Sequence, residues 1–418
     1  MRESEDKAMI VVSNGHHKFI TGMAASEAGK RGMLAGFITA GYPTPGVRKG
    51  IAWLGLDRYA PVKRLLQRQE DLPDDLVHSL WLSELVYRIT GIVARWLPRL
   101  EDLTDYGLRC YAWQARRRLG RLSGRIYHYR SGYGRDSVRL AKRKGMIALC
   151  DHSIAHPSAL AYLVANGGRL PPRGQVPAIG TLWGNVLKDV DQADYLLVNS
   201  DFVKETFVHF GYDPGRIFVL YTGVDDQLMS AIPSRSYPLS GGHVPKLMFA
   251  GDMGNRKGGR ILLRALSKLR DLPWRFEAVG TIDRDLRSEF RDFFADERVT
   301  ITGFLSRAAL AEHMSTADIF VFPSLAEGSA RVIFQAMACG CYVVTTPNAG
   351  SIVQDGVHGR LVPPGDVDAL EAGLRQSLAC PDTIAATGSR NAGLIESSYT
   401  QGHYGDGLMT LYNTLMAR

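Results

Sequence analysis

The segment from Ala317 to Pro364 constrains the fold of this chain more than any other. Two apolar runs, Ile319–Phe322 and Tyr342–Thr345, enclose a helical stretch that Gly340 ends. A strand–helix–strand unit of this kind belongs to a parallel α/β sheet, in which ligands bind beyond the carboxyl ends of the strands. Glu327 stands at such an end, and the N-terminus of the helix after it favours an anion. A carboxylate beside an anion site indicates a ligand with both hydroxyl groups and phosphate, such as a sugar nucleotide.

The residues after Glu327 carry a specific resemblance. Glu327, Gln335 and the run Ala336–Gly340 resemble the donor-site signature of retaining glycosyltransferases of the family 4 type, the glycosyl transferases group 1. The family pattern has a second Glu where this chain has Gln335. The resemblance implies that Glu327 contacts the transferred sugar and that Gln335 meets the nucleotide ribose as a neutral amide. Weaker donor binding, an unusual donor and lost activity are all open outcomes of this exchange.

The resemblance also implies how the diphosphate of a donor is held. Lys257 occupies the position of the family's phosphate-binding Lys, in a Lys-Gly pair that opens a helix. The usual partner is an Arg, which Asp252 replaces here, and Arg256 is the candidate to supply the missing cation. A helix start with two solvated cations is the alternative. The other donor-binding positions that the resemblance implies are Gly22 in the first loop, Gly303 and Phe304 at the end of a strand, and Gly328, Ser329 and Ala330 in the turn after Glu327.

A histidine is expected near the transferred sugar. His152 follows a strand in the first half of the chain, where enzymes of the family have a His that orients donor and acceptor. The alternative is a hydrogen-bonded structural group, as for most single histidines. His156 could take the same role, and His16 and His17 are candidates to meet acceptor hydroxyls. The predicted catalytic set is therefore His152, Lys257 and Glu327.

The domain organisation follows from length and resemblance. A chain of 418 residues exceeds one ordinary core, so two domains are expected. The resemblance implies an α/β chain of GT-B fold, with two doubly wound Rossmann-like domains facing a central cleft. The predicted parts are an acceptor-side domain over 1–230, a linker over 231–244, a nucleotide-sugar-binding domain over 245–395 and a terminal helix over 396–418 that packs back on the first domain. Residues 51–125 are expected to be a helical insertion in the first domain.

This insertion is rich in Arg and Trp. Residues 48–145 hold 21 Lys and Arg against 10 Asp and Glu, a net +11, although the whole chain carries only +8. Four of the six tryptophans, Trp53, Trp81, Trp96 and Trp113, fall in the same region. A basic and aromatic surface, here the segment 106–145, suits an anionic membrane surface and a lipid-linked acceptor. Helical packing with solvated Arg is an equal alternative, and no nucleic-acid-binding motif occurs.

The cysteines and the apolar runs bound the cofactors and the location. Five scattered cysteines without metal-ligand spacing indicate reduced thiols, so we expect no metal site. We also expect no signal peptide and no membrane-spanning run of about 18 apolar residues. The predicted location is the cytoplasm, with peripheral contact to the inner face of the cell membrane. No cofactor is predicted, because the nucleotide sugar, UDP- or GDP-linked, is a substrate.

The sequence thus predicts a metal-independent, retaining hexosyltransferase that acts on a glycan or lipid-linked acceptor in cell-surface polysaccharide synthesis. Two other functions stay open. A sugar-nucleotide epimerase of the same fold would need further acid–base carboxylates in the first domain and lacks the Lys-Gly helix start. A catalytically degenerate scaffold or binding protein is motivated by Asp252 and Gln335, which depart from the family pattern.

Overall fold

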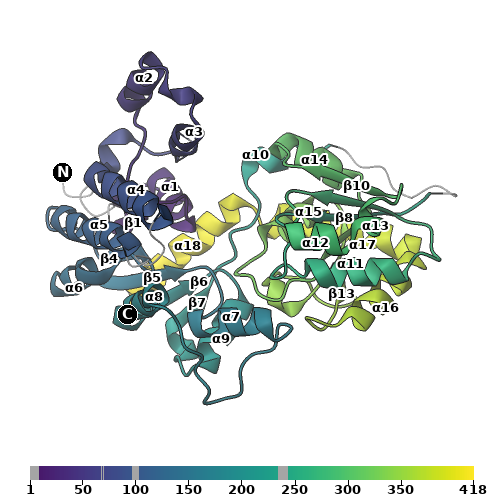
Figure 1. The fold of residues 1–418 in the computed structure, drawn as a ribbon. Coiled ribbons are helices and arrows are strands. Elements are labelled where there is room, and N and C mark those ends of the chain that lie inside the picture. Colours follow the sequence, from purple (N-terminus) through teal and green to yellow (C-terminus); the bar gives the residue numbers. More distant parts are fainter. Residues whose placement is uncertain (1–8, 67, 69, 97–102, 234–242) are drawn as a thin grey trace.

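The chain folds into two α/β domains that lie side by side (Figure 1). The structure is a computed structural model that describes residues 9–66, 68, 70–96, 103–233 and 243–418. Each domain has a parallel sheet with helices on its faces, which confirms the predicted fold class. The predicted linker over 231–244 lies mostly outside the described residues. Among the described helices, none combines the length and the apolar character needed to cross a bilayer.

The first domain is built on a seven-stranded sheet with the order β3-β2-β1-β4-β5-β6-β7. All of its strand pairs are parallel, so every connection between paired strands must cross one face of the sheet. The strands are β1 Ile10–Ser13, β2 Leu34–Thr39, β3 Val77–Ser79, β4 Ile126–Arg130, β5 Ile147–His152, β6 Tyr195–Val198 and β7 Ile217–Val219. The helices are α1 Ile20–Lys30, α2 Pro45–Trp53, α3 Ala60–Leu66, α4 Trp81–Trp96, α5 Leu103–Leu119, α6 Arg135–Arg143, α7 Pro157–Ala165, α8 Thr181–Gln192 and α9 Asp201–His209. Helix α10 Asp226–Met229 follows the first domain in sequence but buries Leu228 in the core of the second.

Alternation along the strands divides the first domain into two cores. Val11 of β1 joins a core with residues of α5, α6, α8 and α9, whereas its neighbours Ile10 and Val12 join a core with α1 and α18. Successive side chains of a strand point to opposite faces, which explains this division. The sheet is therefore covered on both faces, as an all-parallel sheet requires.

The second domain has a six-stranded sheet with the order β10-β9-β8-β11-β12-β13 and a single large core. Its strands are β8 Lys246–Ala250, β9 Arg275–Val279, β10 Val299–Gly303, β11 Ile319–Phe322, β12 Tyr342–Thr345 and β13 Gly359–Leu361. Its helices are α11 Gly259–Lys268, α12 Arg284–Glu289, α13 Arg291–Phe294, α14 Arg307–Ser315, α15 Arg331–Ala338, α16 Val367–Leu378 and α17 Pro381–Ser398. The predicted unit around Glu327 is present as β11, α15 and β12, with β11 and β12 paired directly.

The segment 51–125 differs from the helical insertion that the sequence predicts. It contains β3, which pairs in parallel with β2 and forms one edge of the sheet. Helices α4 and α5 then connect β3 back to β4 and pack against each other. The segment therefore supplies part of the doubly wound domain itself. The α2–α3 part stands out above the domain in Figure 1, and the described residues of α2 include no buried side chain.

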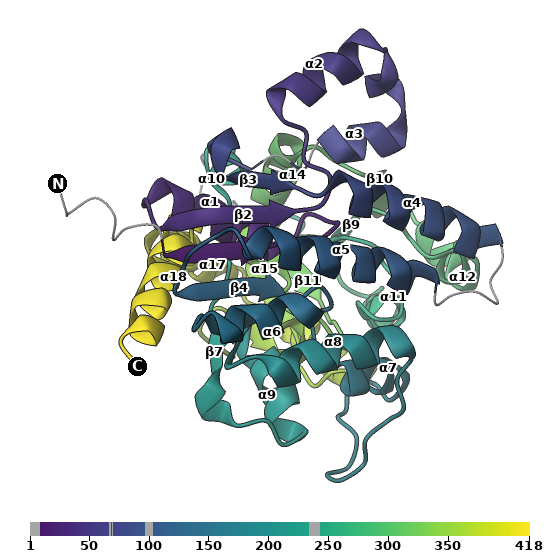
Figure 2. The same ribbon diagram turned by 90° about the vertical axis from the view of Figure 1, so that its left-hand side faces the viewer.

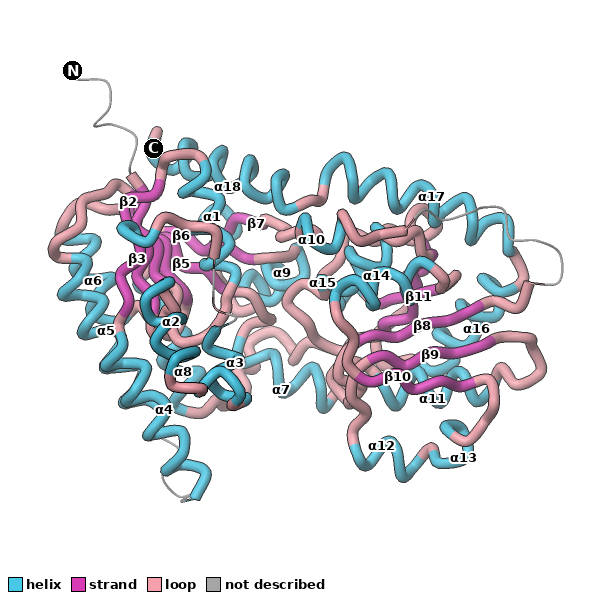
Figure 3. The backbone as a smooth tube through the Cα atoms, turned by 90° about the horizontal axis from the view of Figure 1, so that it is seen from above, coloured by secondary structure: helices cyan, strands magenta, loops and turns pink. Residues whose placement is uncertain are grey.

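The last helix, α18 Gln401–Met416, returns to the first domain. Figure 3 shows α17 and α18 following one another along one side of both domains. Leu408 and Tyr412 are buried in the core beneath α1, and the Tyr412 hydroxyl lies 2.7 Å from Nδ1 of His128. Arg31, the residue just after α1, pairs with Asp406 at 2.6 Å. The chain thus crosses twice between the domains, which limits how they can move apart.

Candidate functional site

The carboxyl edges of the two sheets meet at the turn that contains Gly328. A Cβ atom on Gly328 would lie 1.9 Å from the carbonyl oxygen of Ser153, just beyond β5. The hydroxyl of Ser200, just beyond β6, hydrogen-bonds to the carbonyl oxygen of Gly328 and also caps α9 by accepting from Val203 N–H. The turn after β11 is therefore in direct backbone contact with the first domain, and glycine is required for this approach.

Glu327 is held beside two cations at this contact. Its Oε1 lies 2.6 Å from Nη1 of Arg256 and 3.9 Å from Nζ of Lys257. Its backbone N–H donates to the carbonyl of Asn348 at 3.0 Å, and its side chain is only 15% exposed. The structure thus brings together Arg256, Lys257 and Glu327, three residues that the sequence places in the donor site.

A glycine allows the two cations to reach Glu327. Gly258 has a φ of +73°, and a Cβ atom there would lie 2.0 Å from the carbonyl oxygen of Pro323. The turn before α11 consequently packs directly on the turn after β11. Arg256 Nη1 also donates to the carbonyl of Ala326 at 2.9 Å, and Lys257 Nζ lies 5.3 Å from the ring centre of Phe322. Backbone packing therefore fixes where both positive charges stand.

Asp252, the charge reversal in the family pattern, is bound elsewhere. Its Oδ1 accepts a hydrogen bond from Thr281 Oγ1 at 2.5 Å, and the residue is exposed. The contacts of Glu327 are instead made by Arg256 and Lys257. The Asp252 carboxylate thus has its hydrogen-bond partner, Thr281, outside the Arg256–Lys257–Glu327 cluster.

The turn that leads into α15 offers further polar groups. Ser329 Oγ is buried and makes no hydrogen bond to any described residue. The Ala330 N–H donates to the carbonyl of Ala349 at 2.9 Å, so it is already satisfied. Gln335 lies one turn into α15 beyond its first residue and is half-buried. At the end of β10, Gly303 has a φ of +72° and Phe304 is 79% exposed.

His152 is buried at the end of β5. Its Nδ1 lies 2.9 Å from Ser131 Oγ, its ring packs edge-on against Phe207, and its Nε2 has no partner among the described residues. Burial, together with the nearby Arg130, holds the pKa of His152 well below its usual value. The imidazole is therefore neutral at physiological pH, and it is adjacent in sequence to Ser153 at the domain contact.

The other candidate histidines and Gly22 are engaged in packing. His156 caps α7 by accepting from Ser158 N–H, and His16 lies 3.1 Å from the carbonyl of Ser83. His17 Nε2 lies 3.0 Å from the Tyr87 hydroxyl. Gly22 was expected in a loop but lies in the first turn of α1, where a Cβ atom would come within 2.7 Å of Glu70 Oε1. His16 and His156 are buried by these contacts, whereas His17 is exposed.

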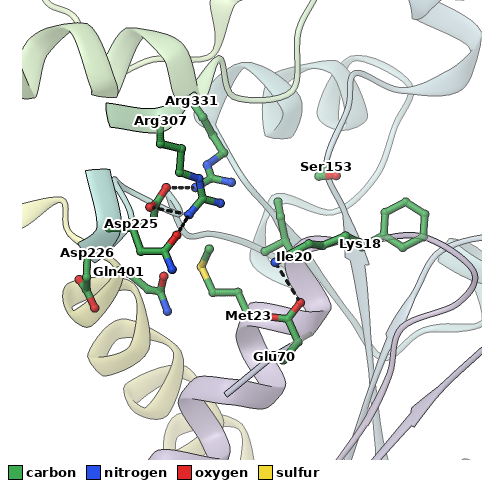
Figure 4. A pocket seen from close by; sticks show the side chains of 12 residues that line it. Lys18, Ile20, Met23, Glu70, Ser153, Asp225, Asp226, Arg307, Arg331 and Gln401 are labelled. Atoms are coloured by element: carbon green, nitrogen blue, oxygen red, sulfur yellow. Dashed lines mark hydrogen bonds and ion pairs between the residues drawn. The ribbon is translucent and has the colours of Figure 1, made fainter. Parts of the chain in front are cut away.

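A cavity of about 570 Å³ lies between the domains next to this cluster. Figure 4 shows side chains from both domains around it. Asp225 accepts from Arg307 at 3.1 Å and Arg331 at 3.4 Å, and Lys18 lies 3.7 Å from Glu70. The lining of the cavity includes Ser153 and these charged residues. Among the described residues, Arg256, Lys257 and Glu327 do not belong to this lining.

Sequence reasoning missed Arg307 and Arg331 in this cavity. The available signal was their position, because each is the first residue of a helix on the carboxyl side of the second sheet. Burial lowers the pKa of the Arg331 guanidinium, and Asp225 opposes that effect. The described His, Cys, Asp and Glu side chains nowhere gather in groups of three that could ligate a metal ion.

Acidification should destabilise the protein from about pH 6.5 downward, because three buried histidines resist protonation. Burial lowers the pKa values of His16, His128 and His156 to about 4. The unfolded chain binds protons at these sites below about pH 6.5 and the folded chain does not, so each site costs about 1.4 kcal/mol per pH unit between those values. Asp189, whose pKa burial raises to about 6, offsets roughly one of them. Urea unfolding at pH 7 and pH 5 should show a free energy of unfolding several kcal/mol lower at pH 5. The expectation fails if stability is unchanged or rises.

Comparison with known proteins agrees with this geometry. Residues 244–379 match the family model described as glycosyl transferases group 1. The chain is 29% identical over 231 residues to a D-inositol 3-phosphate glycosyltransferase of Kineococcus radiotolerans, covering 49% of this chain and 53% of that protein. It is 26% identical over 237 residues to a putative colanic acid biosynthesis glycosyltransferase, WcaL, of Salmonella typhimurium, covering 54% and 57%. The chain spans about half the length of the curated relatives it matches.

Likeness to solved structures extends over the whole chain. The crystal structure of Anabaena Alr3699/HepE in complex with UDP superimposes with a TM-score of 0.61 at 14% identity, covering 97% of this chain and 100% of that one. Identity this low speaks for the fold alone. The chain therefore has the GT-B fold, and its residues 244–379 are similar to the domain described as glycosyl transferases group 1.

Proposed function

We propose that this protein is a retaining glycosyltransferase that moves a sugar from a UDP- or GDP-linked donor to a glycan or lipid-linked acceptor. The observation that supports it most is the convergence of Glu327, Arg256 and Lys257 at the carboxyl edge of the second sheet. A carboxylate can bind sugar hydroxyls while two cations bind a diphosphate. The turn after β11 supplies the carboxylate, and the turn before α11 supplies the two cations beside it. The fold and the family model support the same conclusion.

Each residue of the cluster has a role in this proposal. Both ion pairs of Glu327 use Oε1, which leaves Oε2 to accept from a hydroxyl of the transferred sugar. Lys257 and Arg256 neutralise the leaving diphosphate, helped by the buried hydroxyl of Ser329. Gln335 donates to or accepts from the ribose, and Gly303 and Phe304 meet the base. These interactions need no metal ion, because the protein's own cations stabilise the developing negative charge.

The transfer itself occurs on one face of the sugar in this proposal. The acceptor oxygen forms a bond to the anomeric carbon as the bond to the leaving phosphate oxygen breaks. That phosphate oxygen takes the proton of the acceptor hydroxyl, so the anomeric configuration is retained. Neutral His152 lies behind Ser153 at the domain contact and orients donor and acceptor from the first domain. The contact at Gly328 keeps water from the donor.

The acceptor and the location follow from the relatives and from charge. One relative is named for an inositol phosphate and another for colanic acid biosynthesis. For this chain we propose only the class of acceptor that both names have in common, a hydroxylated molecule used in glycan or glycolipid assembly. The segment 106–145 carries much of the positive charge of the first domain, which fits peripheral contact with the inner face of the cell membrane.

A scaffold without activity is the second candidate function. Gln335 in place of a carboxylate favours it, because a neutral amide binds a ribose hydroxyl less strongly than a charged acceptor does. Asp252 favours it less, since its side chain hydrogen-bonds to Thr281. The two candidates differ in whether a nucleotide sugar binds at all.

A thermal-shift panel of purified protein against UDP-, GDP-, ADP- and CMP-sugars tests the proposal. A ligand present at about 100 times its Kd stabilises the folded state by about 2.7 kcal/mol, which raises the Tm by a few degrees. We expect a shift with a UDP- or GDP-sugar that is the same with EDTA and with added magnesium. Gln335→Glu should change the ligand concentration needed for that shift. No shift with any nucleotide sugar, in either the native or the Gln335→Glu protein, would favour the scaffold.

A further inference from the structure

Helix α4 carries an exposed apolar stripe along its whole length. Leu82, Leu85, Ile89, Ile92 and Trp96 are between 51% and 80% exposed. At 100° per residue these five side chains fall within an arc of about 80°, and they extend over about 21 Å of helix. Isolated exposed apolar residues are ordinary, but a contiguous stripe marks a surface that another phase or molecule covers.

The opposite side of α4 is fixed to the domain. Glu84 is buried and accepts from Arg68 at 2.7 Å and Arg88 at 2.6 Å. The ring of Tyr87 stacks on His16 with centres 4.3 Å apart, and the whole helix packs along α5. The stripe is therefore presented outward by a helix whose other contacts are satisfied, and it is not a core face left open by loose packing.

Helix α5 lies beside α4 on the face shown in Figure 2 and adds aromatic rings with cations over them. Tyr106 and Trp113 are about half exposed. The guanidinium of Arg109 lies 5.8 Å from the ring centre of Tyr106, and that of Arg117 lies 4.8 Å from Trp113. Aromatic rings with a polar rim and long cationic side chains are typical of groups that rest at the boundary between water and lipid.

The exposed charges on the described parts of α4 and α5 have one sign. The acidic residues of α4 and α5 are Glu84 and Asp105, and both are buried and paired with Arg. Arg109, Arg116 and Arg117 are exposed. Every exposed charge among the described side chains of the two helices is therefore positive. A second copy of the same surface would bring like charges together, whereas anionic lipid headgroups would complement it.

We propose that this α4–α5 face, the apolar stripe of α4 with the Arg-bearing side of α5, docks on an anionic lipid bilayer. The stripe enters the boundary between headgroups and acyl chains, and the Arg side chains of α5 stay among the headgroups. The proposal goes beyond the transferase activity and does not depend on it. It also moves the membrane contact from the segment 106–145, whose β4 is buried in the sheet, toward α4.

Docking on this face would orient the catalytic cleft. The N-terminal half of α4 holds His16 and His17, which precede Lys18 and Phe19 of the cavity lining. The helix therefore connects the proposed bilayer contact with the loop that leads into the cavity.

Flotation of the full chain with vesicles tests this proposal without donor or acceptor. The probes are vesicles of phosphatidylcholine alone and of phosphatidylcholine mixed with phosphatidylglycerol. We expect binding to the mixed vesicles, weakened severalfold at high salt. The double variant Ile89→Asn/Ile92→Asn should lower that binding by roughly tenfold or more, because it removes apolar area from the inserted stripe. Arg116→Gln/Arg117→Gln should weaken it by a smaller factor.

Matched variants separate this surface from general stickiness and from misfolding. Val176→Asn/Val357→Asn changes two exposed apolar residues elsewhere and should bind vesicles as the native protein does. Thermal melting checks that each variant is folded, and Leu85→Asn is the second α4 variant if the double one is not. Equal binding by the native protein and a folded α4 variant overturns the proposal. Absence of vesicle binding by the native protein also overturns the proposal. If the native protein then forms dimers that the α4 variant abolishes, the stripe is an interface between two copies of the chain.

Discussion

Lys257→Ala should lower kcat by about 10²- to 10³-fold in the transferase that we propose, with little loss of stability. Lys257 Nζ lies 3.9 Å from Glu327 in a turn that backbone contacts fix, so it is positioned before any ligand arrives. A preorganised cation acts on the charge that develops on the leaving phosphate, where it is worth more than in water. Glu327 would keep Arg256 as a partner at 2.6 Å, so the fold is not left with an unpaired buried carboxylate. Initial rates with the donor found by the thermal-shift panel give the measurement.

Lys268→Ala is the matched control for this variant. Lys268 ends the helix that Lys257 precedes, and it forms an exposed ion pair with Asp368. Its removal takes away the same charge from the same domain and should leave kcat within about twofold, since exposed pairs contribute little. Near-native turnover of Lys257→Ala would take Lys257 out of the mechanism. An equal loss in both variants would point to long-range charge and not to a contact with phosphate.

The second domain and its cluster are the most predictable part of this molecule. The run from Ile319 to Thr345 alternates apolar strand, glycine turn and helix, and each local signal agrees with the others. Glu327 and Lys257 could be placed because both follow strands of one sheet, whose carboxyl ends share an edge. Arg256 could be placed because it directly precedes Lys257 in the sequence. Short sequence spacings and one shared sheet edge were therefore enough to predict these three residues.

Long-range pairs could not be predicted. Asp225 meets Arg307 and Arg331, which are 82 and 106 residues away, and no local pattern links them. Asp252 looks like a reversed charge in a phosphate site until Thr281, 29 residues on, is seen to bind it. In each case the partners lie far apart in the sequence, and only the three-dimensional arrangement brings them together.

The helices after β3 show a different limit of sequence reasoning. Apolar residues spaced as in α4 predict a helix face buried in a core. The same spacing arises when the face is buried in something other than the protein, and the sequence does not distinguish these cases. Exposure of Ile89, Ile92 and Trp96 separates them, because α4 already buries its opposite side. The segment 51–125 was thus predictable as helical, but β3 and the outward stripe were not.

Gly328→Ala should lower kcat/KM of the proposed transferase by about 100-fold, although a single methyl group is added. That methyl would lie 1.9 Å from the backbone carbonyl oxygen of Ser153 and 3.0 Å from the side-chain Asn199 Nδ2, and the closer of the two neighbours is backbone that cannot simply rotate away. Gly350 on the other side is no freer, because its own added Cβ would lie 2.1 Å from the Gly328 carbonyl. The turn or the domains must therefore shift, and a displacement of about 1 Å of Glu327 from the sugar can cost that factor. Overpacking should also lower the free energy of unfolding by about 1–3 kcal/mol.

Gly393→Ala is the matched control, because it adds the same methyl group to the same domain without a close neighbour. Gly393 lies within α17 of the same domain, and nothing comes within 4 Å of a Cβ added there. Its replacement should raise stability by about 0.5–1 kcal/mol, through the helix propensity of Ala, and leave kcat/KM unchanged. The donor-induced thermal shift should persist in Gly328→Ala, since the cations that bind diphosphate belong to the second domain alone. Native kcat/KM in Gly328→Ala would mean that the domains need not meet at this turn for transfer to occur, and the cleft would have to act in a more open arrangement.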